Sequence, residues 1–281
     1  MGTWEYPSSA PVDVNVEITA GAITVTGAET DTIKVRAEPG RPGGSALLAD
    51  LPFPVDLGQR DPAGDLRVDF TDGRLVITEP ELGGLRLRRG GLGLLITVPA
   101  GSRCTVRAVA ADLDCQGELG ALDVRTSSGS VSAAAVHGPV QVNTMSGTIR
   151  VDEAGGPVAV HTASGRIQIG HAADDVSATT ASGGIRIGTA DASVSAKTAV
   201  GKVRLGSVAR GQATVTTASG DITVGVARGT GVYLDLSSTT GRVTSDLEPS
   251  EDGGAAELHL TCRSVTGTLH VARAEHAEVA S

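Results

Sequence analysis

Short runs in which apolar and polar residues alternate follow one another along most of the chain. In the segment TASGRIQIGHAADDVSAT, which begins at Thr162, the apolar residues form two alternating pairs, Ile167/Ile169 and Val176/Ala178. A period of two is typical of β-strands, and Gly170 and the Asp-rich stretch between the pairs are typical of turns. The pattern therefore predicts two short strands and two turns in every 18 residues.

A hexapeptide of the form Thr-x-Ser-Gly-x-Ile/Val marks each repeat. Because one unit cannot bury its apolar pairs alone, it has to stack on the next copy, about 4.8 Å away, so that consecutive units become neighbours. We therefore expect an all-β fold, a single-chain parallel β-solenoid with about 18 residues per rung, where a rung is one turn of the solenoid. Six copies begin at Thr126, Thr144, Thr162, Thr180, Thr198 and Thr217, looser copies begin at Ser238 and Ser264, and one begins earlier, at Ala108.

Two columns of the repeat predict the chemistry of the corner. A glycine before each strand indicates a turn with a positive φ, which glycine adopts at little cost. The threonine that opens the hexapeptide has the same parity as the inward valines, so we expect these hydroxyls to form a stacked hydrogen-bonding ladder at the corner. The glycines are Gly129, Gly147, Gly165, Gly183, Gly201, Gly220, Gly241 and Gly267.

The first hundred residues carry a weaker form of the pattern. We expect residues 1–100 to be capping strands, continuous with the solenoid, with two loops at 39–64 and 81–93. The solenoid itself is predicted over 101–273, with loops at 227–231 and 248–256, and residues 274–281 form a C-terminal tail. The strands predicted in the first part are 12–18, 23–26, 33–38, 66–70, 75–78 and 95–98.

Charge and composition exclude several classes of partner. The formal net charge is -9, which argues against nucleic acid or an anionic membrane as the main partner. The longest apolar run, 92–100, is too short for a membrane span, and the N-terminus shows no secretion signal, so we expect a cytoplasmic protein without membrane insertion. Three cysteines make a disulfide framework unexpected.

Basic residues recur on the outward positions after the glycine corner. They alternate with Ser, Thr or Gln and form a basic stripe on an acidic protein. One interpretation is that exposed charges keep the strands soluble and unpaired. The other is a surface for an anionic glycan, another anionic polymer or an acidic protein. The candidate residues, called the basic face below, are Arg150, Arg166, Arg186, Lys202, Arg204 and Arg242.

The residues that catalysis or metal binding would need are scattered. The aspartates fall in different phases of the repeat or several rungs apart, so no pair is placed for general acid/base chemistry. The six histidines also occupy different phases, and none has metal-ligand spacing. We therefore expect no enzyme activity, no cofactor and no metal. The aspartates in question are Asp112, Asp114, Asp174, Asp175 and Asp221.

Three segments carry a resemblance to a known family. The Thr-Ala-Ser-Gly-x-Ile units, the stretch LLITVPAGSRCTVRAVAADL and the stretch GVYLDLSSTTGRVTSDL resemble the bacterial domain-of-unknown-function family catalogued as putative adhesins, in the leaderless form common in actinobacteria. The resemblance covers nearly the whole chain. It implies a right-handed β-solenoid with no established catalytic residues.

Three functional hypotheses follow. The first is a non-enzymatic scaffold or binding module that engages a protein or a polyanionic or glycan partner. The second is a self-assembling solenoid, a homo-oligomer formed by end stacking, because stacked rungs can continue into another chain. The third is a carbohydrate-active β-helix enzyme.

Overall fold

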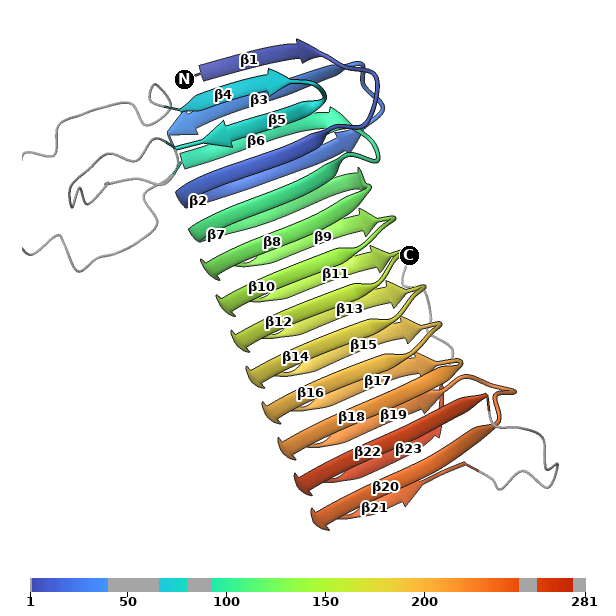
Figure 1. Ribbon diagram of the computed structural model, residues 1–281. Helices are drawn as coiled ribbons and strands as arrows, with labels where there is room; N and C mark the ends of the chain where they lie inside the picture. Colours follow the sequence, from blue (N-terminus) through green and yellow to red (C-terminus); the bar gives the residue numbers. More distant parts are fainter. Residues whose placement is uncertain (1, 40–65, 80–91, 248–256, 275–281) are drawn as a thin grey trace, which may run out of the picture. The chain divides into compact units, whose positions relative to one another are not determined.

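The computed structural model describes residues 2–39, 66–79, 92–247 and 257–274, and within these ranges every regular element is a β-strand (Figure 1). The chain divides into two compact units, residues 1–131 and 132–281. The all-β prediction is therefore confirmed for the described residues. The expected loop at 248–256 and the tail beyond Ala274 lie outside them, as do most of the expected loops at 39–64 and 81–93.

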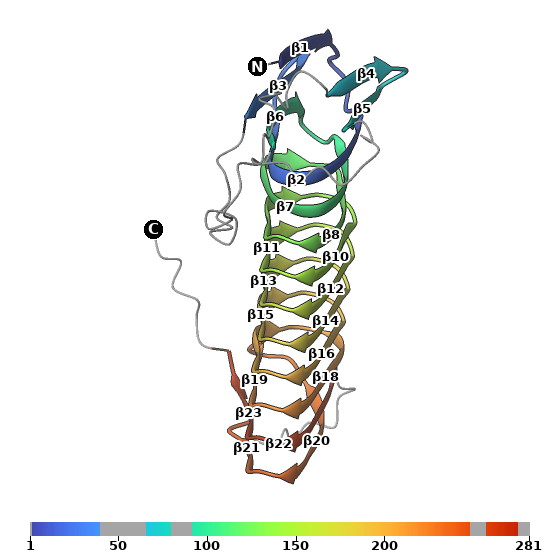
Figure 2. The same cartoon turned by 90° about the vertical axis from the view of Figure 1, so that its left-hand side faces the viewer.

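The second unit is a parallel β-solenoid with two walls (Figure 2). Each strand pairs in parallel with its counterpart in the next rung, so that Val158 is opposite Val176 and Ile167 opposite Ile185, 18 residues apart. The predicted fold and repeat length are thus confirmed. Wall one contains β10 (Val140–Ser146), β12 (Val158–Ser164), β14 (Val176–Ser182), β16 (Val194–Val200), β18 (Gly211–Ser219), β20 (Val232–Thr240) and β22 (Leu258–Thr266). Wall two contains β9 (Val131–Val136), β11 (Ile149–Ala154), β13 (Ile167–Ala172), β15 (Ile185–Ala190), β17 (Val203–Val208), β19 (Ile222–Val226), β21 (Val243–Ser245) and β23 (Leu269–Arg273).

The last two rungs are not stacked in sequence order. Strand β18 pairs with β22, and β22 in turn pairs with β20, while in wall two β19 pairs with β23 and β23 with β21. The rung of β22 and β23 is therefore inserted between two rungs that precede it in the chain (Figure 1). The expectation that consecutive units are always neighbours is wrong here.

Side-chain polarity explains this order. The inserted rung places Leu269 and Val271 inward, and both are buried. Their counterparts in the outermost rung are Val243 and Ser245, and Ser245 is exposed. Since an interior position rewards apolar side chains and penalises an unpaired hydroxyl, the more apolar copy lies inside and the copy with serine lies at the end.

Wall-two strands depart from strict alternation. In β15, Ile185 and Ile187 point inward as predicted, but the next buried residue is Ala190, three positions on. Gly188 lies in this gap, and a Cβ atom built on it would be 2.3 Å from the Gly170 carbonyl oxygen of the preceding rung. Because Gly188 has no side chain, neighbouring rungs can approach closely at this point of the strand. The strand changes direction here, and Ala190 becomes the third residue that points into the core.

The corner glycines follow the prediction with one exception. Seven of them have φ values between 124° and 156°, which favour glycine. Gly241 does not have a positive φ, so the prediction is wrong there; its constraint is steric, since an added Cβ would lie 2.0 Å from the Gly267 carbonyl oxygen. The seven glycines are Gly129, Gly147, Gly165, Gly183, Gly201, Gly220 and Gly267.

The threonine column is buried at the corner, as its parity predicted. Its hydroxyls, however, do not bond to one another. Thr198 Oγ1 donates to the Gly183 carbonyl oxygen at 3.1 Å, and Thr217 Oγ1 donates to that of Gly201 at 3.4 Å. Thr198 and Thr217, like Thr180, therefore link their rungs to the backbone of the rung before. Thr144 Oγ1 donates within its own rung, to the Ser146 carbonyl oxygen, and the buried Thr162 Oγ1 has no hydrogen-bond partner among the described residues.

The first unit contains both parallel and antiparallel pairs. Strands β2 and β7 pair in parallel, as do β7 and β8, whereas β1 with β3, β3 with β6 and β4 with β5 are antiparallel. All six segments predicted as strands in the first hundred residues are strands to within a few residues, but those at 12–18 and 23–26 form one continuous strand, and the strand at Gly2–Pro7 was not predicted. The bounds are β1 (Gly2–Pro7), β2 (Asp13–Ala28), β3 (Thr32–Pro39), β4 (Arg67–Thr71), β5 (Arg74–Thr78), β6 (Leu92–Pro99), β7 (Arg103–Leu119) and β8 (Ala121–Ser128).

Candidate functional site

The six residues of the basic face all lie in the second unit and are exposed. Three of them occupy one outward column of wall two, where register places Arg186 beside Arg204, and Gln168 separates Arg186 from Arg150. The other three, Arg166, Lys202 and Arg242, sit at the corner, two residues before this column in their rungs. Because residues i and i+2 of a strand share a face, the structure brings both sets onto one side of wall two.

Ion pairs neutralise two of the six. Arg150 Nε lies 2.8 Å from Asp152 Oδ1, and Lys202 Nζ lies 3.1 Å from Asp221 Oδ2. The remaining four make no ion pair with any residue in the described parts of the chain. Arg186 and Arg204 are the closest of these, since they face outward from adjacent strands about 4.8 Å apart. Two like charges at this spacing repel each other, and a bound anion would relieve that repulsion.

Two of the aspartates accept hydrogen bonds from the backbone of a neighbouring rung. Asp175 Oδ1 accepts a hydrogen bond from the Ser193 N–H at 3.0 Å, and Asp221 Oδ1 accepts one from the Thr268 N–H at 3.1 Å. The hydrogen bond from the Thr268 N–H lowers the pKa of Asp221 from its ordinary value of 3.8. The hydrogen bond from Lys202 is the second-largest cause and acts in the same direction. These carboxylates therefore clamp one rung to the next, a role that the sequence analysis missed although their place just before a strand signals it.

Other chemically reactive groups are shielded. All three cysteines are buried, and burial raises the pKa of Cys262 to about 12. A hydrogen bond to Cys104, together with burial, raises the pKa of Cys115 well above its ordinary value. The thiols of Cys115 and Cys262 are thus protonated at neutral pH and are poor nucleophiles. Within the described ranges no group of His, Cys, Asp or Glu side chains has the geometry of a metal site, and no helix could span a membrane.

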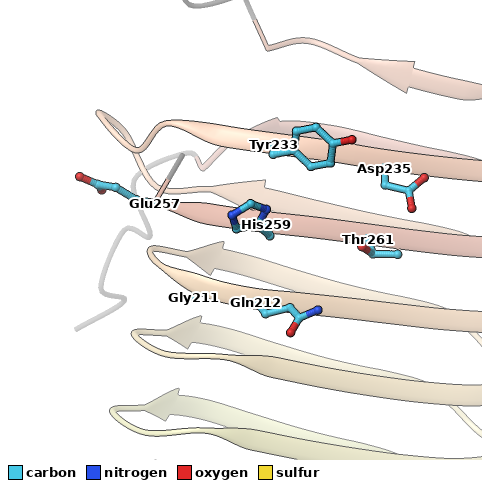
Figure 3. Close-up of a pocket in the computed structure, with 7 residues that line it drawn as sticks. All are labelled: Gly211, Gln212, Tyr233, Asp235, Glu257, His259 and Thr261. Atoms are coloured by element: carbon cyan, nitrogen blue, oxygen red, sulfur yellow. The ribbon is translucent and has the colours of Figure 1, made fainter. Parts of the chain in front are cut away.

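A shallow groove lies on the outer side of wall one (Figure 3). Its volume is about 540 Å³, and strands β18, β22 and β20 form its floor. The sequence analysis did not find it, because its residues come from three separate repeats. The polar and aromatic side chains that line it are Gln212, Tyr233, Asp235, Glu257, His259 and Thr261.

Comparison with known proteins places the chain in a family. No curated protein matches it. Two solved structures are similar: a putative adhesin from Bacteroides fragilis, with 10% identity over 96% of this chain and 95% of that chain and a TM-score of 0.39, and a putative adhesin from Parabacteroides distasonis, with 11% identity over 96% and 97% and a TM-score of 0.42. The profile of the Toastrack DUF4097 family matches residues 92–269, which span most of the repeats, and the chain therefore belongs to the Toastrack DUF4097 family.

Proposed function

We propose that this protein is a non-enzymatic binding scaffold whose basic face engages an anionic polymer, such as an acidic glycan or an acidic polypeptide segment. The observation that carries the proposal is the pair Arg186 and Arg204, adjacent in register and without an acidic partner among the described residues. Arg166 and Arg242 extend the same side of wall two with two more unpaired cations. Arg166, Arg186 and Arg204 belong to three consecutive rungs, whereas the rungs of β19 and β23 separate Arg204 from Arg242. The solenoid holds the first three charges at regular intervals, which suits a partner with regularly repeated anionic groups.

Because the arginine side chains of the basic face are exposed to solvent, each contact with an anion is weak. Each exposed ion pair contributes little, roughly 0.2–1 kcal/mol, and is screened by salt. Useful affinity therefore requires several contacts along one polymer chain. The proposal thus implies weak, salt-dependent binding that increases with the length of the anionic polymer.

Reversing two charges tests this function. Binding of heparin and of poly-L-glutamate is measured over a series of NaCl concentrations, for the wild-type protein and for Arg186→Glu/Arg204→Glu. We expect the double variant to bind about tenfold more weakly at low salt, because two attractive contacts become repulsive. Lys197→Glu/Arg228→Glu is the control, since it changes the net charge equally at exposed residues outside the basic face. Equal affinity of wild type and the Arg186→Glu/Arg204→Glu variant for both polymers would contradict the proposal.

A second candidate function is end-to-end assembly. In the outermost rung, Leu234 and Leu236 are only half-buried and Val243 is 42% exposed, although their counterparts in inner rungs are buried. Within the described residues, β20 pairs only with β22 and β21 only with β23. An unpaired strand edge with apolar neighbours is a template for another chain.

Assembly predicts a molar mass that rises with concentration in light scattering. Val243→Lys should return the protein to a monomer, because a lysine on an edge strand opposes pairing. Val200→Lys is the matched control: Val200 is also exposed, but its strand β16 is paired on both sides. A constant monomer mass for the wild-type protein over the whole series would exclude this function.

A further inference from the structure

The groove on wall one exists because three strands are longer than the rest. The wall-one strands β10, β12, β14 and β16 begin at equivalent positions, which align with Ala213, Leu260 and Leu234. Strands β18, β22 and β20 each begin two residues earlier. The added outward positions are Gln212, His259 and Tyr233, which are direct neighbours in the register (Figure 3). The second unit thus carries one local platform that its other rungs lack.

Tyr233 is the exceptional residue of this platform. It is the only Phe, Trp or Tyr in residues 132–281, and its side chain is 61% exposed. The ring contacts the His259 ring, with centroids 5.8 Å apart and planes tilted by 46°. Because the inserted rung of β22 puts β20 outermost, His259 supports the tyrosine from one side only. An aromatic ring contributes the most favourable free energy when a partner removes it from water. A ring that is supported by the protein but still exposed is therefore typical of a binding surface.

The groups around the ring can form hydrogen bonds that the protein itself leaves unmade. The Gln212 amide, the Glu257 carboxylate and the Thr261 hydroxyl have no side-chain hydrogen bond to any described residue. Two backbone hydrogen bonds fix the position of Glu257: its N–H donates to the Gly231 carbonyl at 3.0 Å, and its carbonyl accepts from the Gly211 N–H at 2.9 Å. These side chains offer both donors and acceptors beside an apolar ring face.

Charge separates this groove from the basic face. Asp235 and Glu257 both line it, and Asp235 Oδ2 lies 3.6 Å from Arg263 Nη2 at its margin. Glu257 has no such cationic partner in the described structure. An anionic ligand would therefore meet an unneutralised carboxylate, whereas a neutral ligand with many hydroxyls would meet acceptors.

We infer that the groove binds a neutral carbohydrate, one or two pyranose units of a glycan. The C–H face of a pyranose ring is apolar and flat and would pack on Tyr233, while its equatorial hydroxyls would donate to Asp235 and Glu257 and exchange hydrogen bonds with Gln212. The volume of about 540 Å³ lies within the range of roughly 300–1,000 Å³ that is usual for small-molecule sites. This site is separate from the basic face and does not depend on its function.

The test uses the full chain and neutral oligosaccharides of defined linkage, namely glucan, mannan, galactan and chitin fragments. Each is screened by saturation-transfer NMR, and affinities are then measured by calorimetry. We expect at least one of them to bind the wild-type protein, and Tyr233→Ala to weaken that binding at least tenfold. Tyr233→Phe keeps the ring and should stay within about threefold of wild type. Since Tyr233 is exposed, all three proteins should have the same thermal unfolding midpoint.

Two control arms make each result decisive. Arg186→Glu/Arg204→Glu should bind the neutral sugar as wild type does, so that loss of heparin binding and loss of sugar binding are read separately. Failure of every neutral oligosaccharide to bind, or equal binding by wild type and Tyr233→Ala, would overturn the inference. Tyr233-dependent binding of a lysine-rich peptide with no sugar binding would also overturn it, because the groove would then be a site for cations.

Discussion

Replacing Gly183 with alanine should strongly destabilise the second unit. The residue has a φ of 148°, and a Cβ atom there would lie 1.9 Å from the Gly165 carbonyl oxygen of the preceding rung. That oxygen belongs to the backbone and cannot move without separating two rungs. We expect a loss of more than about 4 kcal/mol in the free energy of unfolding, measured by urea denaturation followed by circular dichroism.

The neighbouring glycine is the control for this substitution. Gly184 has no positive φ, and its Cβ would contact only the Lys202 carbonyl oxygen, at 3.3 Å. Arg166 and Lys202 occupy the same position in the rungs on either side, so the site accepts side chains. Gly184→Ala should therefore stay within about 1 kcal/mol of wild type. If the two variants were equally stable, close rung stacking at the glycine corner would not be what holds the solenoid together.

Truncating Leu260 should cost far more than truncating Leu234. The two leucines are Cα partners in register, but Leu260 lies in the inserted rung and is fully buried, while Leu234 lies in the outermost rung and is half-buried. Leu260→Ala leaves a cavity between two rungs and should lower the free energy of unfolding by roughly 2–5 kcal/mol. Leu234→Ala removes contacts on one side only, and we expect a loss of about 1–2 kcal/mol.

This pair of variants reports directly on the rung order. In a solenoid stacked in sequence order, Leu234 would be the inner residue and Leu260 the outer one, and the two losses would be reversed. Amide hydrogen exchange gives a second measurement: amides of β20 should exchange faster than those of β22, because terminal rungs of repeat proteins open first. Faster exchange in β22 than in β20 would contradict the inserted position of the last repeat.

Several features follow from the sequence by itself. The period of two, the interval of 18 residues and the inward parity of the threonines were sufficient for the fold, the repeat length and the burial of the Thr198 and Thr217 hydroxyls. They suffice because in-register stacking turns local spacing into spatial position: residues one repeat apart become neighbours. The same logic placed Arg186 beside Arg204.

Other features are not determined by the repeat spacing, because more than one arrangement is compatible with it. In the last two repeats the wall-one strands β20 and β22 have the same length and similar apolar columns. Their order is decided by competition for the buried position, which Leu269 and Val271 occupy in preference to Val243 and Ser245. The close approach of Gly188 and of Gly241 to carbonyl oxygens of other rungs likewise depends on how the rungs stack.

The candidate sites were likewise predicted only in part from the sequence. Repeat spacing was enough to collect the six cations of the basic face on one side, because they recur at two phases of the repeat that lie two residues apart. It did not reveal that Asp152 and Asp221 neutralise two of them, nor that Tyr233, His259 and Gln212 meet on wall one. The two ion pairs are local contacts, since Arg150 and Asp152 lie in one strand and Lys202 and Asp221 lie in consecutive rungs. The meeting of Tyr233, His259 and Gln212 depends on the inserted rung and on strands that extend past the repeat, and both are products of tertiary packing between segments distant in the chain.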